Sequence, residues 1–408
     1  KILINGEKDY MGRLWDISNK IDKEILSFTV YKDNKIDEKL IKYDILASIA
    51  HAKMLAKIGI ISKEEKEKIL DILNELLKKA ENNQIKIEIE EEDMHTKIEN
   101  YLTQKLGELG EKIHTARSRN DQVMVALRLF YKDKIKEVEK ATKKFIKVLK
   151  KFEEKFGSIT IPGLTHTRKA IPTTVNIWIG SFVESLRDDL KLLRTVKNFV
   201  DQNPLGSGAG FGIPAIEVDR EYTTKLLNFS RTQNNPLYVQ NSRGKFESLI
   251  AHAISMIMYD INKLSTDLIL FSFDEIGFVK LPKEILTGSS MMPNKENPDI
   301  FEIARGSYSK IIILEEWLNI LPMNLISGYH RDLQFTKEAI FEVFETAIKT
   351  INIMAKTFSE IQIDEEKAKK LITKEMYATE NVNKLVLNGL PFREAYKIVK
   401  RNLSKPKD

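Results

Sequence analysis

Apolar residues recur every three or four positions over long stretches of the chain, and this spacing predicts helices. The predicted helical stretches are residues 36–80 (two helices), 94–107, 121–156, 172–200, 217–228, 242–273, 298–320 and 335–361. A helix of about 30 residues is roughly 45 Å long, which suits a bundle better than a compact globule. We therefore expect an all-α fold with a central bundle of long helices, whose apolar faces are covered by oligomerisation.

Local signals refine this prediction. Ser62, followed three residues later by Glu65, indicates an N-cap. Residues 85–92 alternate Ile with Lys or Glu, which fits either a short strand or a connector. After Ile363 the pattern changes to short helices. We expect three domains: an N-terminal helical domain (1–112), a central long-helix domain (113–361) and a small C-terminal helical domain (362–408).

Composition excludes several classes of protein. The 408 residues include only 18 Gly and 11 Pro, too few for the turns of an all-β fold. The chain has no cysteine, which excludes disulfides, a thiol nucleophile and cysteine-based metal sites. Its six histidines form neither an i, i+4 pair nor an HExxH motif, so no metal site is expected.

Charge and hydropathy narrow the choice of partners. The chain has 65 Lys and Arg against 59 Asp and Glu, and both signs are spread along its length. No Arg-rich arm occurs, so we expect small acidic substrates rather than nucleic acid. No apolar run approaches the length of about 18 residues that a membrane span needs. The first residues, KILINGEKDY, lack the apolar core of a signal peptide, so we expect a cytoplasmic protein without membrane contact.

Candidate chemistry lies in four polar segments between the predicted helices. Residues 114–122, HTARSRNDQ, fit either a helix start capped by Asn120 or Asp121 or an anion site built from arginines and free amides. Residues 162–168, PGLTHTR, precede Pro172, which we expect to open a helix. His166 in this segment is either a structural hydrogen-bonding residue or a catalyst.

The other two segments are richer in glycine. Residues 204–212, PLGSGAGFG, lack the Lys-Ser/Thr ending of a phosphate loop, and they fit equally a connector or a backbone that cradles a ligand. Residues 287–299, TGSSMMPNKENPD, carry a high density of hydrogen-bonding groups, with Glu302 one turn into the next helix. A loop with a Gly hinge can close over a substrate and exclude water.

These segments resemble a known family. The run GSSMMPNKENPD resembles the signature of the fumarase/aspartase superfamily, whose members release fumarate. Within it the chain is similar to the argininosuccinate lyases over nearly its whole length. The motifs that carry this likeness are SIAHAKML, DMHTKIE, HTARSRNDQV, GLTH, PLGSGAG, GYHRDLQFTKE and MYATENVNKLVLNGLPFREAYKIV. The resemblance implies a homotetramer that splits argininosuccinate into arginine and fumarate without a cofactor, with each active site shared between chains.

The resemblance also implies residue roles. By spacing alone His166 is the better base, because a free Ser hydroxyl is a weak base at neutral pH. The family instead implies Ser289 as the base, with His166 and Glu302 acting on the leaving side and Lys295 and Asn297 stabilising the dianion. The family implies Ser118, Asn120 and Thr165 as binding positions for the succinyl part, and Tyr329, Gln334 and Lys337 for the arginine part. Arg119 also falls in a binding motif.

Departures from the family pattern and two alternatives stay open. Asp33 aligns near a position at which the family has a Ser that touches substrate, so this chain adds a carboxylate there. Arg168 aligns with a position at which a neutral amide is common in the family. One alternative keeps the fold but changes the substrate to that of fumarase, aspartase or adenylosuccinate lyase. The other is a catalytically silent assembly protein like the crystallins related to this family.

Overall fold

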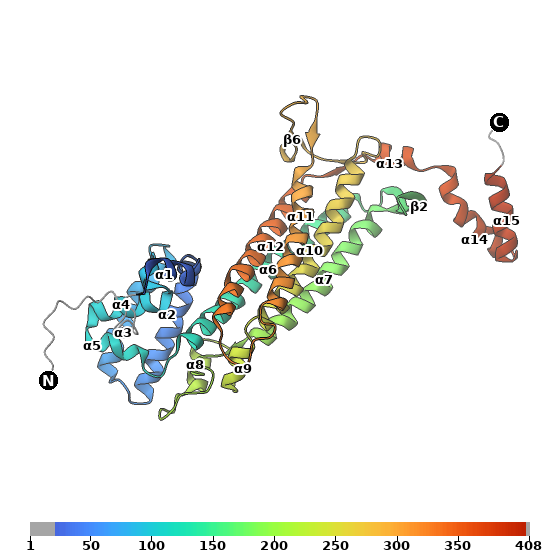
Figure 1. The fold of residues 1–408 in the computed structure, drawn as a ribbon. Helices are drawn as coiled ribbons and strands as arrows, with labels where there is room; N and C mark the ends of the chain where they lie inside the picture. Colours follow the sequence, from blue (N-terminus) through green and yellow to red (C-terminus); the bar gives the residue numbers. More distant parts are fainter. Residues whose placement is uncertain (1–20, 405–408) are drawn as a thin grey trace, which may run out of the picture. The chain divides into compact units, whose positions relative to one another are not determined.

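The computed structural model describes residues 21–404, most of which lie in helices (Figure 1). The segment KILINGEKDY, on which the expectation of a missing signal peptide rests, lies outside the described residues. The chain divides into two compact units. Unit 1 comprises residues up to Glu137, Leu193–Ala253 and Ile312–Glu345, and unit 2 comprises Val138–Leu192, Ile254–Ile311 and the chain from Thr346 on.

Five long helices contribute segments to both units. They are α6 (Arg119–Phe156), α7 (Val175–Val200), α10 (Lys245–Ser272), α11 (Asp299–Ile320) and α12 (Thr336–Phe358). Each lies close to a range that apolar spacing predicts, because a stripe of apolar residues must be buried along the whole helix. The expected all-α class with a long-helix bundle is therefore confirmed.

The other elements of unit 1 are short or of medium length. They are α1 (Lys23–Val30), α2 (Asp33–Lys57), α3 (Lys63–Glu81), η1 (Ile89–Glu91), α4 (Met94–Leu106), α5 (Glu108–Glu111), η2 (Lys112–His114), β3 (Gln202–Asn203), α8 (Arg220–Leu226), β4 (Arg231–Thr232), α9 (Pro236–Asn241) and η4 (Arg331–Phe335). Strands β3 and β4 pair in parallel. The segment 85–92, left open as strand or connector, is a connector that ends in the 3-10 turn η1.

Packing in unit 1 joins α2 and α6 to the segments after α7. Ala47, Val125 and Phe229 belong to one buried apolar cluster. Phe130 on α6 stacks on Phe341 of α12 with ring centroids 4.2 Å apart. The predicted cap of α3 is confirmed, since the Ser62 hydroxyl accepts from the Glu65 amide and the Glu65 carboxylate accepts from the Ser62 amide.

Unit 2 combines helix segments with several two-stranded sheets. Its further elements are β1 (Thr160–Thr165), β2 (Arg168–Thr174), β5 (Val279–Lys280), η3 (Lys283–Ile285), β6 (Thr287–Gly288), β7 (Glu296–Asn297), β8 (Gln362–Ile363), α13 (Glu365–Leu371), η5 (Lys374–Tyr377), α14 (Ala378–Leu387) and α15 (Phe392–Leu403). The sheets β1–β2, β5–β8 and β6–β7 are antiparallel. Segments of α6 and α12 lie side by side in this unit, where Phe145 and Phe152 contact Phe358 (Figure 1).

One prediction in unit 2 is wrong. Pro172 does not open a helix but lies in β2, directly opposite Pro162 of β1, and α7 begins only at Val175. The hairpin bulges at Gly163, where a Cβ atom would lie 2.5 Å from the carbonyl oxygen of Ile171, so only glycine fits. The segment 162–168 is therefore the tip of a hairpin rather than a loop between helices.

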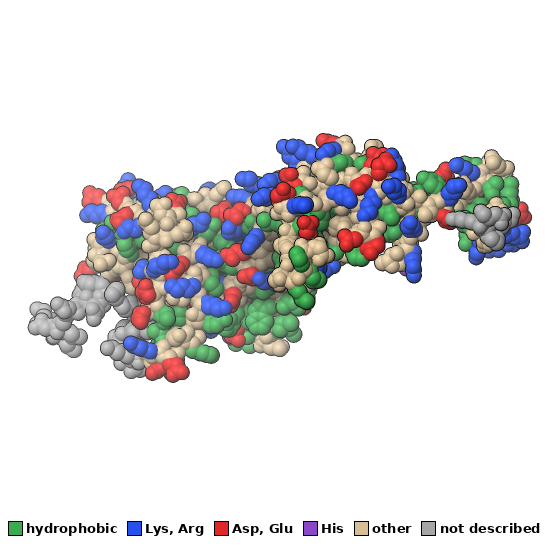
Figure 2. Space-filling view, turned by 90° about the horizontal axis from the view of Figure 1, so that it is seen from above, with side chains coloured by type: hydrophobic (Ala, Val, Ile, Leu, Met, Phe, Trp, Pro, Cys, Tyr) green, Lys and Arg blue, Asp and Glu red, His purple; other side chains and the backbone are tan. Residues whose placement is uncertain are grey.

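The last helices, α14 and α15, form a small helical pair. Val382 of α14 packs with Ala395 and Val399 of α15 in an apolar cluster of their own. On the face of the molecule shown in Figure 2, basic and acidic side chains of the described residues are interspersed. This mixed surface matches the alternation of charges along the sequence.

Candidate active site

A cavity of about 150 Å³ in unit 1 gathers charged side chains from five parts of the chain. They are the first turn of α2, the segment that leads into α4, the first turn of α6, the segment between α9 and α10, and the residues around η4. The lining residues are Asp33, Asp37, Glu92, Asp93, His95, Arg119, Asn120, Val123, Arg243, Tyr329, Arg331 and Lys337. Four of the predicted binding residues, Arg119, Asn120, Tyr329 and Lys337, thus line one cavity.

Lys337 lies between two carboxylates in this cavity. Its Nζ atom is 2.8 Å from Asp33 Oδ2 and 2.8 Å from Asp37 Oδ1, and its side chain is 3% exposed. Burial raises the pKa of Asp37 to about 6, although the ammonium of Lys337 acts in the opposite direction. Burial lowers the pKa of Lys337, but Asp37 and Asp33 outweigh it, so the net shift is upward. The charged form of the lysine is therefore held in place.

Two arginines of the cavity have carboxylate partners. Arg119 Nη1 lies 2.8 Å from Asp93 Oδ2, and its Nη2 donates to Thr96 Oγ1 at 2.7 Å. Arg331 Nη2 lies 2.9 Å from Glu92 Oε1. These pairs fix the guanidinium groups before any ligand arrives, which is how preorganised sites reduce the cost of binding.

Arg243 differs from the other arginines. Its Nε atom donates to Thr336 Oγ1 at 3.3 Å, and its guanidinium carbon lies 5.8 Å from the centre of the Tyr329 ring. The residue is 3% exposed, and no carboxylate within residues 21–404 forms an ion pair with it.

A buried network supports the cavity from behind. His95 Nδ1 lies 2.7 Å from Asp44 Oδ2, and Arg117 donates to Asp44 Oδ1 at 3.3 Å and to Ser48 Oγ at 2.9 Å. Burial lowers the pKa of His95, yet the carboxylate of Asp44 outweighs it and the net shift is upward. Buried charges are stable only when they are paired and hydrogen-bonded in this way.

The first turn of α6 corrects another prediction. The helix begins at Arg119, so its N-cap is Ser118 rather than Asn120 or Asp121. The Ser118 hydroxyl accepts from the Asn120 amide at 3.3 Å, and the Ser118 amide donates to Asp121 Oδ1 at 3.0 Å. Asp121 is the acidic partner three residues after the cap, which is the capping-box position.

Asp121 also decides the function of the glycine-rich segment. Its Oδ2 atom accepts from the amides of Gly206 at 2.9 Å and Gly208 at 3.0 Å. The pKa of Asp121 is raised by its burial, which these hydrogen bonds only partly offset. The amides that a ligand would need are therefore occupied, and segment 204–212 is a clamped connector.

The predicted catalytic loop lies in unit 2. Strands β6 and β7 close it as a hairpin with Thr287 opposite Asn297 and Gly288 opposite Glu296. Ser289 Oγ accepts from the backbone amides of Met291 at 3.3 Å and Met292 at 3.1 Å. Two donors directed at one hydroxyl oxygen favour its ionised form.

A cavity of about 590 Å³ lies beneath this loop. Its lining includes Lys295, Asn297 and Glu302 together with Lys280 and Lys367. The lining holds three lysines and three acidic residues, Asp274, Glu296 and Glu302, so charges of both signs surround this cavity. Three of the predicted catalytic or binding residues in unit 2 thus lie together.

His166 lies at the tip of the β1–β2 hairpin and is exposed, as is Thr165 beside it. His166 and Thr167 both have positive φ angles, 53° and 58°, a left-handed conformation that is costly for residues other than glycine. Within residues 21–404 no hydrogen bond or ion pair joins His166 to Glu302 or Ser289. Its pairing with Glu302 therefore stays a prediction.

Two other predicted residues lie outside the unit 1 cavity lining. Ser118 is occupied as the α6 cap, and Gln334 donates through Nε2 to the carbonyl of Thr29 at 3.2 Å. Sequence reasoning missed Asp37, Glu92, Asp93, His95, Arg243 and Arg331. For Asp37 a signal existed, because Asp33 and Asp37 are four residues apart and so lie on one face of α2.

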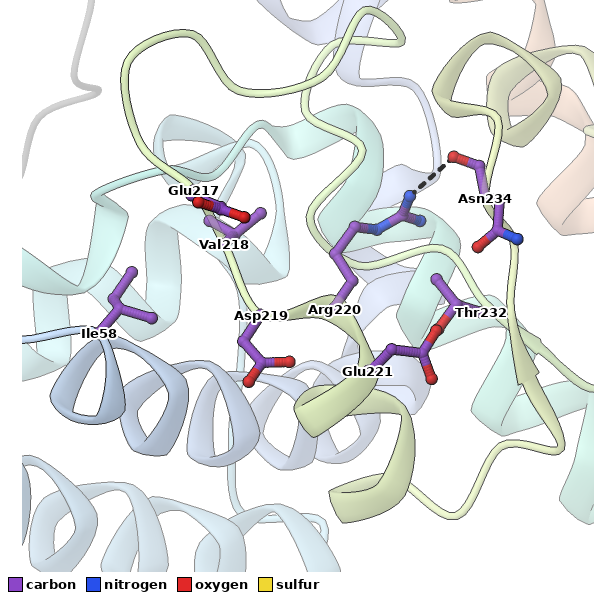
Figure 3. A pocket seen from close by; sticks show the side chains of 8 residues that line it. All are labelled: Ile58, Glu217, Val218, Asp219, Arg220, Glu221, Thr232 and Asn234. Atoms are coloured by element: carbon purple, nitrogen blue, oxygen red, sulfur yellow. Dashed lines mark hydrogen bonds between the residues drawn. The ribbon is translucent and has the colours of Figure 1, made fainter.

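A further cavity of about 600 Å³ in unit 1 contains none of the predicted site residues. Its lining residues are Ile58, Glu217, Val218, Asp219, Arg220, Glu221, Thr232 and Asn234 (Figure 3). The Arg220 guanidinium donates to three backbone carbonyls, those of Asn234 at 3.1 Å (Figure 3), Gln233 at 2.8 Å and Leu205 at 2.9 Å. Arg220 therefore fastens the chain rather than binding a ligand.

Residues 21–404 contain neither a cluster of metal-binding side chains nor a helix suited to a bilayer. No group of three or more His, Cys, Asp or Glu side chains within residues 21–404 is placed to hold a metal ion. None of the helices in this range is both long enough and apolar enough for a bilayer span.

Comparison with known proteins identifies the family. A family model described as lyase matches residues 17–313. An argininosuccinate lyase of Thermotoga neapolitana is 50% identical over 97% of this chain and 99% of its own length. One of Bacteroides fragilis is 39% identical over 95% of this chain and 86% of its own length.

Solved structures match the fold. An EDDS lyase in complex with formate superposes with a TM-score of 0.80 at 20% identity, over 94% of this chain and 76% of that one. A class II fumarase from Schistosoma mansoni superposes with a TM-score of 0.77 at 15% identity, over 91% of this chain and 85% of that one. The long-helix architecture is thus that of the fumarate-releasing lyases, and the chain belongs to the argininosuccinate lyase family of the fumarase/aspartase superfamily.

Proposed function

We propose that this chain splits argininosuccinate into arginine and fumarate by β-elimination, as a carbon–nitrogen lyase of arginine biosynthesis. The observation that carries the proposal is the identity of 50% to an argininosuccinate lyase over almost the full length of both chains. An identity of 39% to a second such enzyme supports it. The proposed reaction needs no cofactor.

The reaction begins at Ser289. Its alkoxide removes a proton from the carbon next to a carboxylate of the succinyl part, which creates an aci-carboxylate dianion. The amides of Met291 and Met292, which donate to Ser289 Oγ, support this role because they stabilise a negative charge on that oxygen.

The dianion then collapses to fumarate as the carbon–nitrogen bond breaks, and the leaving guanidino nitrogen takes up a proton. Lys295 and Asn297 stabilise the dianion, and their place on one cavity with Glu302 supports this assignment. We assign His166 to the leaving side, with Glu302 as its partner.

Binding is assigned to both units. Ser118, Asn120 and Thr165 hold the succinyl carboxylates, and Tyr329, Gln334 and Lys337 hold the arginine part. Arg119 belongs to the same binding segment as Ser118 and Asn120. Four of these seven residues line the unit 1 cavity, which supports a binding function there.

The proposed assembly is a homotetramer with active sites shared between chains. Ile313, Trp317 and Ile320 support it, because they recur at i, i+4 and i+7 on α11 and are 69%, 44% and 54% exposed. Such an apolar stripe on a long helix normally packs against a partner. We further propose three domains (1–112, 113–361, 362–408) and a cytoplasmic location.

One assay tests the activity. The protein is mixed with argininosuccinate, and fumarate is followed by its ultraviolet absorbance. Turnover supports the proposal. Release of fumarate from malate, aspartate or adenylosuccinate instead would assign the chain to a sister reaction, and no turnover of any of these would indicate a silent, crystallin-like assembly protein.

A further inference from the structure

We infer that Met291 is a modification site: a peroxide converts it to methionine sulfoxide, and this change stops turnover until the sulfoxide is reduced. The inference rests on the proposed function, because it concerns the loop that carries the proposed base Ser289. It adds to that function a regulation by oxidants.

Methionine is the side chain of this chain that peroxides oxidise most readily. The chain has no cysteine, which is the other side chain that peroxides attack easily. It has 11 methionines, of which Met11 lies outside the described residues. Oxidation therefore falls on the methionine sulfur atoms that solvent can reach.

Most of the described methionines are shielded from a peroxide. The buried ones, none of them more than 3% exposed, are Met54, Met94, Met124, Met258, Met354 and Met376. Met256 is half-buried. The exposed ones are Met291, at 86%, Met323, at 60%, and Met292, at 43%. Met291 is thus the most accessible methionine within residues 21–404.

Two of the exposed methionines lie next to the proposed base. Met291 and Met292 follow Ser289 in the loop that β6 and β7 close, and this hairpin projects beyond the start of α11 (Figure 1). The backbone amides of both methionines donate to Ser289 Oγ, at 3.3 Å and 3.1 Å. The hydrogen bonds that favour ionised Ser289 therefore depend on the backbone of two residues that a peroxide can reach.

The oxidation step transfers one oxygen atom to the sulfur. The Met291 Sδ atom attacks one oxygen of hydrogen peroxide, and the O–O bond breaks as the S–O bond forms. The other oxygen leaves as water, with both hydrogens of the peroxide. The sulfur loses two electrons and the peroxide gains them, so the step needs no further reactant.

The new oxygen changes the hydrogen bonding around Ser289. A thioether sulfur is only a weak acceptor, whereas a sulfoxide oxygen is a strong one. This oxygen can accept from the amide of its own residue, which withdraws that N–H group from Ser289 Oγ. The side chain also becomes polar, so burying it when the loop closes costs free energy. Both effects slow proton removal by Ser289.

The modification is reversible. Methionine sulfoxide reductases return the sulfoxide to methionine, with one enzyme for each epimer. Thiols supply the two electrons and form a disulfide, and the oxygen leaves as water. Because this chain has no cysteine, the thiol reductant leaves the rest of the chain unchanged.

The test treats the full-length protein in its native assembly with hydrogen peroxide, and catalase removes the excess before each assay. Peptide mapping by mass spectrometry gives the sulfoxide fraction at each methionine, and fumarate release from argininosuccinate gives kcat. We expect Met291 to be oxidised before Met323 and Met292. As its sulfoxide accumulates, kcat should fall by about tenfold or more, the effect of losing one hydrogen bond to a charged oxygen. The two reductases together should restore the rate.

Three variants assign the effect to one side chain. Met291→Leu keeps the size and apolar character of the side chain but cannot be oxidised. Relative to its own untreated rate, it should retain most of its activity at a peroxide dose that inactivates the wild type. Met323→Leu, at the other highly exposed position, is the matched control and should be inactivated like the wild type. Met291→Gln places a polar acceptor at the same position, so its untreated kcat should lie below that of Met291→Leu.

The outcomes separate this inference from the proposed function. Inactivation that Met291→Leu does not prevent would overturn the inference, and so would slower oxidation of Met291 than of Met323. Full activity of wild-type protein whose Met291 is completely oxidised would overturn it as well. An untreated protein without turnover would instead overturn the proposed function, and the sulfoxide fractions alone would then decide whether Met291 is the preferred site.

Discussion

Lys337 and Lys295 are the same residue type in two opposite settings. Lys337, in the unit 1 cavity, is 3% exposed and held by two carboxylates. Lys295, on the loop of unit 2, is exposed and forms no ion pair within residues 21–404. The first charge is fixed by the fold, and the second is free to move with its loop.

The same contrast holds for the two regions as wholes. Unit 1 builds its cavity from helix ends, and most of its charges are already paired, which suits recognition of a fixed ligand shape. Unit 2 carries the proposed catalytic groups on a loop and a hairpin tip, where few side chains of the described residues have partners. Catalytic groups on such segments become effective when the segment closes and water leaves. Binding and chemistry should therefore be separable by mutation.

The largest expected effect is the loss of turnover in Ser289→Ala. Removing the base should lower kcat by about 10³-fold or more, while L-arginine binding stays within about twofold because Ser289 is not part of the unit 1 cavity. Steady-state kinetics and calorimetry measure the two quantities. Ser290→Ala is the matched control. An active Ser289→Ala enzyme would remove the proposed base.

Substitutions of Lys295 and Lys337 test the contrast between the two units directly. Lys295→Met should lower kcat by about 10²- to 10³-fold without a change in stability. Lys337→Met should cost about 3 kcal/mol of stability, because it leaves two buried carboxylates without their cation. Urea denaturation and kinetics of both variants check this. Equal stability of the two variants would contradict the distinction between the regions.

Unit 2 also contains two carboxyl groups, of Asp189 and Asp260, that are largely buried and form no ion pair with a Lys or Arg side chain within residues 21–404. Burial raises the pKa of Asp189 on α7 to about 7, with the nearby carboxyl group of Asp260 acting in the same direction, and burial also raises the pKa of Asp260 on α10. Between the ordinary and the raised pKa, the native state binds more protons than the unfolded state. Stability should therefore fall as the pH rises from about 4 to 7.

The variant Asp189→Asn should remove much of this dependence. We expect it to match the wild type near pH 5 and to exceed its melting temperature at pH 8. Thermal unfolding at several pH values measures the effect, with Asp188→Asn on the exposed face of α7 as the control. A wild-type curve that is flat over this range would contradict the raised pKa values of the two carboxyl groups.

The smallest expected effect concerns the hairpin tip. Thr167 has a φ angle of 58°, which costs about 1 to 2 kcal/mol for a non-glycine residue. Thr167→Gly should stabilise unit 2 by roughly 0.5 to 1 kcal/mol, because the added freedom of the unfolded chain offsets part of the gain. Denaturant unfolding measures this change in the free energy of unfolding. Thr160→Gly, in the regular part of β1, should destabilise instead.

Local patterns predicted the helices well, because the apolar residues that each helix buries recur every three or four positions in its own sequence. The predicted range 242–273 compares with Lys245–Ser272 for α10, and the Ser62 cap was correct. The β1–β2 hairpin was missed because its two-residue turn is His166-Thr167 rather than the usual Asn-Gly pair.

The candidate site could be predicted only in part. The family resemblance singled out Tyr329 and Lys337, and both line the unit 1 cavity. No local pattern shows that Lys337 pairs with Asp33 and Asp37, because such pairs depend on the fold rather than on neighbouring residues. The cap of α6 was misplaced for a related reason, since Asp121 is a good cap by type but bonds to Gly206 and Gly208 far along the chain.

The Lys337–Asp37 contact has a consequence for biosynthesis. The two residues are 300 positions apart in the sequence. At a synthesis rate of roughly 5 to 20 residues per second, the lysine follows its aspartate by about 15 to 60 s. During that interval α2 presents its acidic face without its counter-ion, so the cavity around Lys337 is among the last parts of unit 1 to form during synthesis. Substitutions that weaken this contact should therefore reduce the yield of folded enzyme more than they reduce the activity of the molecules that do fold.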